Sequence, residues 1–257
     1  GLGLTDTGGK VAENTTAVND TGVAGTFMHK KTADTGTTGA LANITNGVYR
    51  LTTTQTAGTV TPAGTAAGIV APTLSWKPNM GPGSQSGRMR FGARIKASTY
   101  SDGMASIFAG FTDDTMDTGT VEMPIYDTGR TGDSGASAVV VASDLVGFLW
   151  GTNGDTGWRG VARKSTAGDS GAQQVTLTTS APTANTWVNL EVEVHRGLSD
   201  TGGQATFYVN GVPQGRINSP VASTVAMTPC IMIADTGGAT TLDVDWLNVS
   251  APRDTGT

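Results

Sequence analysis

Two pairs of carboxylates have a spacing that could support acid–base chemistry. Glu191 and Glu193 lie two residues apart in an alternating run, as do Asp243 and Asp245. Side chains two apart on a strand share one face of a sheet, so each pair can bring two carboxyl groups together. Sandwich-fold glycosidases use such carboxylates as acid and as base or nucleophile. Both pairs fall on the polar side of their runs, so solvated carboxylates are the preferred interpretation.

The tripeptide Asp-Thr-Gly occurs nine times. It is the signature of aspartic proteases, in which two carboxylates share a proton, and the copy at Asp235 fits best because an apolar run precedes it. Most other copies have polar surroundings, which favours turn chemistry. Asp113, Asp114 and Asp117 could bind calcium through their oxygens, although their spacing matches no known calcium loop. His195 is interpreted as a polar residue at a strand end, not as a base.

Trp158 is the best candidate among five tryptophans for an exposed aromatic side chain. It follows a turn-rich Gly-Asp-Thr-Gly segment and could stack on a sugar or lie in an interface. Burial in the core is nevertheless the favoured interpretation of Trp158. With no Ser-His-Asp arrangement and no phosphate-binding loop in view, we expect no catalytic residue, no bound metal and no cofactor.

The composition favours an all-β protein. Of 257 residues, 37 are glycine and 10 are proline, and only 14% are charged. These proportions disfavour a helical bundle or a helix-rich α/β enzyme. The formal net charge of −5 argues against nucleic acid or an anionic membrane as partner, and no apolar run approaches the length of a membrane-spanning helix. The single cysteine, Cys230, excludes an intrachain disulfide.

Alternating apolar and polar residues predict the strands that must position these side chains. The clearest runs are residues 88–96, 188–195, 205–210 and 242–246, and further apolar runs are 104–111, 138–142, 145–150 and 230–234. Asn210-Gly211 predicts a tight hairpin turn, and Pro213 in the return strand predicts an edge strand or a bulge. The spacing of these runs predicts antiparallel sheets packed face to face, with a sandwich over residues 47–257.

Residues 1–46 lack a sustained apolar period and are predicted to form an extended N-terminal arm with short pairings. Such a segment buries little apolar area by itself, so we expect it to be held by its own globular body or by neighbouring chains. The candidate contact residues of the arm are its scattered apolar side chains, Val11, Val18, Phe27 and Met28.

The C-terminal two thirds of the chain resembles a known family. The segments that carry the resemblance are residues 143–150, 158–164, 186–194, 205–211 and 242–249. In this order they resemble the concanavalin A-like, or laminin-G-like, jelly-roll sandwiches, and more narrowly the structural proteins of tailed bacteriophages. The resemblance implies an antiparallel jelly-roll β-sandwich. The sugar and calcium ligands of lectins, and the carboxylate cluster of sandwich glycosidases, have no clear match.

From this resemblance we expect a non-enzymatic virion protein that decorates and cements the outer capsid surface. Its expected partners are the major capsid protein and other copies of itself, because an arm that spans subunits adds binding free energy to the shell. One alternative is a receptor- or glycan-binding module of a tail or capsid fibre, with cell-surface glycan as partner. A third class is an enzyme: a sandwich-fold glycosidase, for which Glu193 is the candidate, or a protease, for which Asp235 is the candidate.

Overall fold

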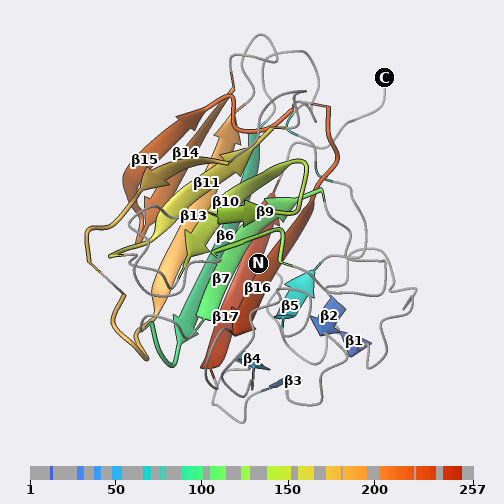
Figure 1. The fold of residues 1–257 in the computed structure, drawn as a ribbon, viewed down its shortest axis with the longest axis vertical. Helices are drawn as coiled ribbons and strands as arrows, with labels where there is room; N and C mark the ends of the chain where they lie inside the picture. Colours follow the sequence, from blue (N-terminus) through green and yellow to red (C-terminus); the bar gives the residue numbers. More distant parts are fainter. Residues whose placement is uncertain are drawn as a thin grey trace.

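The computed structural model describes somewhat more than half of the chain, and Figure 1 shows these residues as coloured strands and loops. The described residues are 12–13, 28–31, 38–41, 48–53, 66–70, 76, 78, 88–100, 105–113, 123–127, 138–151, 156–164, 172–180, 182–195, 203–222, 224–235 and 240–250. Among them every regular element is a β-strand. No helix in this part of the chain is long and apolar enough to cross a membrane.

A seven-stranded sheet forms one layer of the molecule. Its strand order is β15-β14-β13-β6-β17-β4-β3, and all neighbours are antiparallel. The bounds are β3 (Thr38–Leu41), β4 (Tyr49–Thr53), β6 (Arg88–Ala97), β13 (Val188–His195), β14 (Gln204–Val209), β15 (Val212–Asn218) and β17 (Thr240–Ser250).

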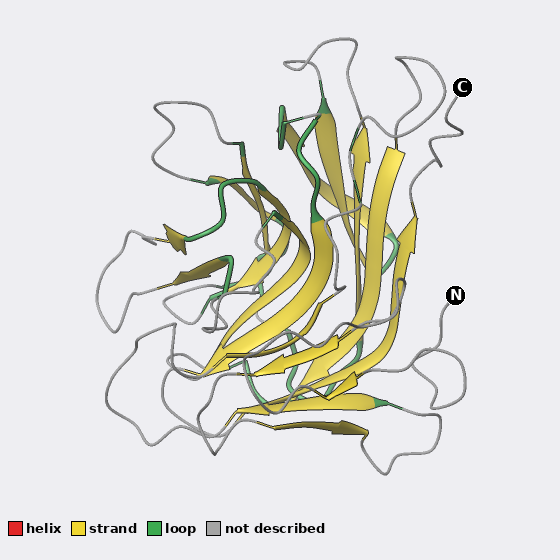
Figure 2. Ribbon diagram, turned by 90° about the vertical axis from the view of Figure 1, so that its right-hand side faces the viewer, coloured by secondary structure: helices red, strands yellow, loops and turns green. Residues whose placement is uncertain are grey.

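An eight-stranded sheet forms the second layer, and Figure 2 shows the two layers facing each other. Its order is β1-β2-β5-β16-β7-β10-β11-β12, antiparallel except for the β1–β2 pair. The bounds are β1 (Ala12–Glu13), β2 (Met28–Lys31), β5 (Ala66–Val70), β7 (Ala105–Thr112), β10 (Leu145–Trp150), β11 (Arg159–Arg163), β12 (Gln173–Thr176) and β16 (Thr228–Asp235). A separate hairpin pairs β8 (Ile125–Asp127) with β9 (Ala138–Val140). The predicted antiparallel sandwich is therefore confirmed.

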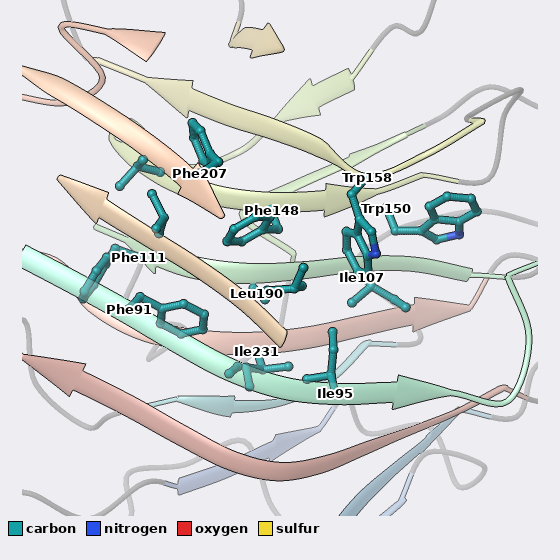
Figure 3. Packing of buried hydrophobic residues seen from close by; sticks show 14 of the residues in the cluster. Phe91, Ile95, Ile107, Phe111, Phe148, Trp150, Trp158, Leu190, Phe207 and Ile231 are labelled. Carbon is teal, nitrogen blue, oxygen red and sulfur yellow. The ribbon is translucent and has the colours of Figure 1, made fainter. Parts of the chain in front are cut away.

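The main core fills the space between the two sheets. Alternate residues of β6 and β13 point into it, as the period-2 pattern of both runs predicts. Aromatic rings bridge the layers: Phe91 of β6 meets Phe111 of β7, and Phe148 of β10 meets Phe207 of β14, both edge to face. Figure 3 shows these four side chains pointing toward one another.

The outer face of the eight-stranded sheet is largely apolar and covered, with Arg159 and Arg163 of β11 also on this side. Leu145, Leu149, Val161 and Met232 point away from the main core and are fully buried. They form a second cluster with Ile125 and other residues of the segment that carries the β8–β9 hairpin. Among the described residues, this face therefore presents no group of paired carboxylates.

The hairpin at Asn210-Gly211 has the predicted geometry. Both residues have positive φ, 52° and 78°, as a tight turn between twisted antiparallel strands requires. The return strand β15 lies at the edge of its sheet, and the register shifts between Phe207 and Tyr208, opposite Pro213. The edge and the bulge that Pro213 predicts are both observed.

The described parts of residues 1–46 pair with the body of the molecule. β2 runs along β5 with Met28 opposite Val70, and β3 runs along β4 at the edge of the other sheet. Short pairings of this kind were expected. Val11, Val18 and Phe27 lie outside the described residues. The boundary between an arm and a sandwich at residues 46–47 stays a prediction.

Candidate functional site

Charged side chains gather on the outer face of the seven-stranded sheet. Because Phe91, Ala93 and Ile95 of β6 point into the core, the residues between them point outward, and the same holds for β13. We name this surface the charged face. It consists of Arg50 from β4, Arg88, Arg90, Arg94 and Lys96 from β6, Glu191, Glu193 and His195 from β13, and Asp243, Asp245 and Trp246 from β17.

The most buried charge on this face is the carboxylate of Asp243, whose side chain is 2% exposed. Arg50 donates two hydrogen bonds to it, from Nε at 2.6 Å and from Nη2 at 2.8 Å. Lys96 lies on its other side, with Nζ 3.2 Å from Oδ2. Burial alone would raise the pKa of Asp243, but the hydrogen bonds and positive charges of Arg50 and Lys96 outweigh it, so this pKa is lowered.

The other carboxylates of the charged face are also paired across strands. Arg90 pairs with Glu191, and this hydrogen bond raises the pKa of the Arg90 guanidinium. Arg88 lies 3.3 Å from Glu193. His195 approaches the same carboxylate at 3.4 Å. The two arginine pairs span β6 and β13, whose register brings Glu193 opposite Arg90 and His195 opposite Arg88, whereas the contact between His195 and Glu193 lies within β13.

One further ion pair depends on an irregularity in β17. The register between β17 and β6 shifts between Val244 and Trp246, so Asp245 is the extra residue. Arg94 donates a hydrogen bond of 2.9 Å to its carboxylate. A bulge of this kind re-aims a side chain, and here Asp243 and Asp245 both reach bases on the same face.

Two tryptophans lie among these charges. The guanidinium carbon of Arg94 is 5.1 Å from the ring centre of Trp187, and Nζ of Lys96 is 4.7 Å from it. Both distances fall within the range of cation–π attraction. The ring of Trp246 lies over Gly92, where an added Cβ would be 3.2 Å from the ring. Glycine at position 92 thus leaves the space that a half-buried indole occupies on the sheet.

The ion pairs test the interpretation of the paired carboxylates as solvated side chains. Glu191, Glu193, Asp243 and Asp245 do share one face, but each contacts a base. They are therefore not simply solvated. The alternation of Arg and Lys in residues 88–96 was the available signal in the sequence. Sequence reasoning missed Arg50 as a partner of Asp243, 193 positions away.

Trp158 is buried, so it is not the exposed sugar-stacking or interface side chain for which it was a candidate. Its side chain is 1% exposed and points into the core beside Ile107 (Figure 3). Edge-to-face contacts with Trp150 and Tyr100, at centroid distances of 6.1 and 6.2 Å, hold the ring there. The polar turn before Trp158 can direct the chain into the core because Gly157 has no side chain. Its backbone packs directly against Thr178, where a Cβ atom would not fit. Core burial, the favoured interpretation, is what the structure shows.

The remaining candidates do not form a site in the part of the chain that is described. Asp235 ends β16, and its side chain is not described. Asp113 follows β7, and burial raises its pKa. Asp114 and Asp117 lie outside the described residues, which contain no group of three or more possible metal ligands. His195 ends β13, as predicted.

Comparison with known proteins places the fold. No family model matches the chain, and no curated protein matches its sequence. Among solved structures, it is similar to an endo-1,3-β-glucanase from Streptomyces sioyaensis, with a TM-score of 0.51, 11% identity, and coverage of 81% of this chain and 77% of that one. It is also similar to an endo-β-1,4-glucuronan lyase from Trichoderma reesei, with a TM-score of 0.48, 10% identity, and coverage of 88% and 87%. A glycosyl hydrolase family 16 protein from Mycobacterium smegmatis has a TM-score of 0.42, 16% identity, and coverage of 79% and 75%.

These comparisons correct two expectations. The glucanase, whose TM-score is above 0.5, is named for a glycan-cleaving enzyme and not for a virion protein. The expectation of a capsid decoration or cement protein, and with it the expectation that the chain is not an enzyme, is therefore wrong. The expected partners, the location on a virion and the glycan ligand stay predictions. At identities this low the likeness establishes the fold: the chain is a concanavalin A-like jelly-roll β-sandwich.

Proposed function

We propose that this protein cleaves an acidic polysaccharide, which binds along the charged face. The observation that carries the proposal is the gathering of five basic side chains on neighbouring strands, with aromatic rings between them. The charged face holds four carboxylates, so it has one excess positive charge with histidine neutral. The chain as a whole carries −5. A polyanion is therefore attracted to this face in preference to the rest of the surface.

The bases on β6 suit a ligand with regularly repeated anions. Arg88, Arg90, Arg94 and Lys96 follow one strand, and outward residues two apart are separated by roughly 6.5 Å. A guanidinium has five N–H donors, and one carboxylate uses one or two of them. Arg88 and Arg90, whose side chains are 66% and 53% exposed, therefore keep donors for a carboxylate of the ligand.

Trp246 adds an apolar surface beside these charges. Its ring lies on Gly92, close to Glu191, and is only partly buried. The C–H face of a sugar ring can stack on such an indole, while the hydroxyl and carboxyl groups reach the bases around it. Aromatic and basic side chains together therefore favour an acidic sugar over a neutral one.

The ion pairs favour elimination over hydrolysis. Hydrolysis needs a carboxyl group that stays protonated at neutral pH because its pKa is raised. On the charged face each carboxylate contacts a base, and the pKa of Asp243 is lowered. This setting opposes the acid role that the glycosidase alternative requires.

Elimination from a uronate needs a different set of groups. A base removes the proton beside the substrate carboxylate, a C=C bond forms, and the glycosidic oxygen leaves with a proton. Positive charge at the carboxylate stabilises the negative charge that develops there. Arg90 is placed for this role. Tyr208 lies opposite Glu191 and near Arg90; as a phenolate it takes the proton from the carbon, and as a phenol it then gives that proton to the leaving glycosidic oxygen.

The proposal is tested with the full chain and purified polyuronates. Elimination produces a C=C bond conjugated to a carboxylate, which absorbs in the ultraviolet, so we expect absorbance to rise with time. Arg90→Gln should lower this rate at least about tenfold, the effect of losing roughly 1.4 kcal/mol of transition-state stabilisation. The matched control is Arg216→Gln on the exposed edge strand β15, which should keep the rate. Absence of product from every polyuronate, or an unchanged rate in Arg90→Gln, would contradict the proposal.

A further inference from the structure

A cavity of about 250 Å³ lies at the end of the sandwich where β13 begins and the β14–β15 hairpin turns. Both sheets contribute to its walls: Trp158 precedes β11 of the eight-stranded sheet, whereas Val188 and Val209 belong to the seven-stranded sheet. The segment that precedes β13 closes one side. The lining residues are Trp158, Thr178, Ser180, Pro182, Thr183, Thr186, Trp187, Val188, Val209 and Asn210.

The lining combines an apolar wall with a polar rim. Trp187, Pro182 and Val209 provide apolar surface, whereas the hydroxyl groups of Ser180, Thr183 and Thr186 and the amide of Asn210 are polar. This combination suits a ligand that has both C–H faces and hydroxyl groups. The volume falls below the range of about 300–1,000 Å³ that holds drug-sized ligands, so it fits a molecule the size of one sugar ring.

Two rim groups keep free hydrogen-bonding capacity. Oδ1 of Asn210 accepts a hydrogen bond of 2.9 Å from the backbone N–H of Asn189, which fixes the orientation of the amide. Nδ2 of Asn210 has no hydrogen-bond partner among the described residues, and neither has the hydroxyl group of Thr186. By contrast, the hydroxyl group of Thr178 accepts from Trp158 N and donates to Ser180 O. Asn210 and Thr186 therefore have donors available to a ligand.

Trp187 connects the cavity with the charged face. The same indole lines the cavity and interacts with Arg94 and Lys96 of β6. These contacts restrict the ring before any ligand arrives, which lowers the entropic cost of binding. A polymer that follows β6 toward Lys96 thus reaches the mouth of a small pocket that can hold only one unit.

We infer that this cavity is a binding site for a single sugar unit, with Asn210 Nδ2 and Thr186 Oγ1 as hydrogen-bonding groups and Trp187 as the wall. The assignment as a sugar site stands on the lining of the cavity. Its further description as the subsite for the end unit of an acidic polysaccharide rests on the proposed function. The description as an end-unit subsite accounts for the position of the cavity at one end of the charged face.

The test measures binding of D-glucuronate and D-glucose to the full chain by NMR titration or calorimetry. Thr186→Val removes one hydroxyl group without changing size and should weaken binding of both sugars about two- to tenfold, as the loss of one hydrogen bond does. Asn210→Asp keeps the acceptor for Asn189 N–H and tolerates the positive φ, but replaces the donor with a negative oxygen. It should weaken glucuronate binding at least about tenfold, and more than glucose binding.

The matched control is Asn218→Asp at the far end of β15, where Oδ1 accepts from Gln204. It makes the same chemical change outside the cavity and should leave binding unchanged. If neither sugar binds, or if Thr186→Val and Asn210→Asp bind like the unaltered chain, the cavity is not a sugar site. If the sugars bind as expected but no polyuronate is cleaved, the cavity assignment holds and the proposed function fails.

Discussion

Replacing Asp243 by asparagine should destabilise the folded protein by about 2 kcal/mol at neutral pH. The carboxylate is 2% exposed and holds Arg50 through two hydrogen bonds and Lys96 through an ion pair. Asparagine keeps the size of the side chain and one acceptor. It removes the negative charge, so two bases remain beside a buried neutral amide.

The magnitude follows from the exposure of the two bases. Breaking a fully buried ion pair costs about 3–5 kcal/mol, whereas an exposed pair contributes about 0–1 kcal/mol. The side chains of Arg50 and Lys96 are 39% and 21% exposed, so water can stabilise their charges when Asp243 is neutral. The expected loss therefore lies between these limits.

The pH dependence has a defined sign. The pKa of Asp243 is lower in the folded chain than in the unfolded chain, where it is about 3.9. The contribution of Asp243 to the free energy of unfolding is therefore present above pH 4. It is lost as the pH falls toward the lowered pKa of the folded state. The difference in the free energy of unfolding between the unaltered chain and Asp243→Asn should be constant from pH 7 to about pH 5 and should narrow below pH 4.

Urea unfolding followed by tryptophan fluorescence measures this difference. Asp245→Asn is the matched control, because its carboxylate is 22% exposed and its partner Arg94 40% exposed. It should cost less than about 1 kcal/mol. Equal stability of Asp243→Asn and the unaltered chain at pH 7 would refute the reasoning. So would a difference that stays the same below pH 4.

Three further predictions concern the fold. Burial raises the pKa of Tyr100 to about 12, so its phenol should ionise late in an absorbance titration, and Tyr100→Phe should remove that step. The neutral phenol of Tyr100 contributes to the free energy of unfolding below pH 10, and this contribution is lost as the pH rises through 12. Gly147→Ala should cost about 1–3 kcal/mol in urea unfolding, since its Cβ would lie 2.5 Å from the carbonyl oxygen of Ala109 on β7. Gly211→Ala should cost about 1–2 kcal/mol in the same assay, because residue 211 has a φ of 78°.

The fold was predictable because its signals are local. The alternation in residues 188–195 reflects one buried and one exposed face, and the turn at Asn210-Gly211 reflects a backbone that few residues tolerate. Both depend on neighbours within a few positions. The sequence therefore predicted most of the sandwich strands and the edge position of the strand with Pro213.

The site was less predictable because its contacts are distant in sequence. Nothing near Asp243 indicates that Arg50 will reach it, since that contact needs β4 and β17 to pair in a particular register. The position of Trp158 also depends on distant contacts. Its polar neighbours made it a candidate for exposure, but packing against Trp150 and Tyr100 buries it, as the favoured interpretation of the sequence predicts. The cavity beside Trp187 combines three segments and has no local signature.

Mass analysis of the products formed from a polyuronate tests the central claim most directly. Elimination on the charged face predicts oligosaccharides whose new end is unsaturated, each lighter by one water than the product of hydrolysis. These products should be formed by the unaltered chain and by Arg216→Gln, and should largely disappear with Arg90→Gln. Saturated products that have gained water, or unsaturated products formed equally by Arg90→Gln, would contradict the account.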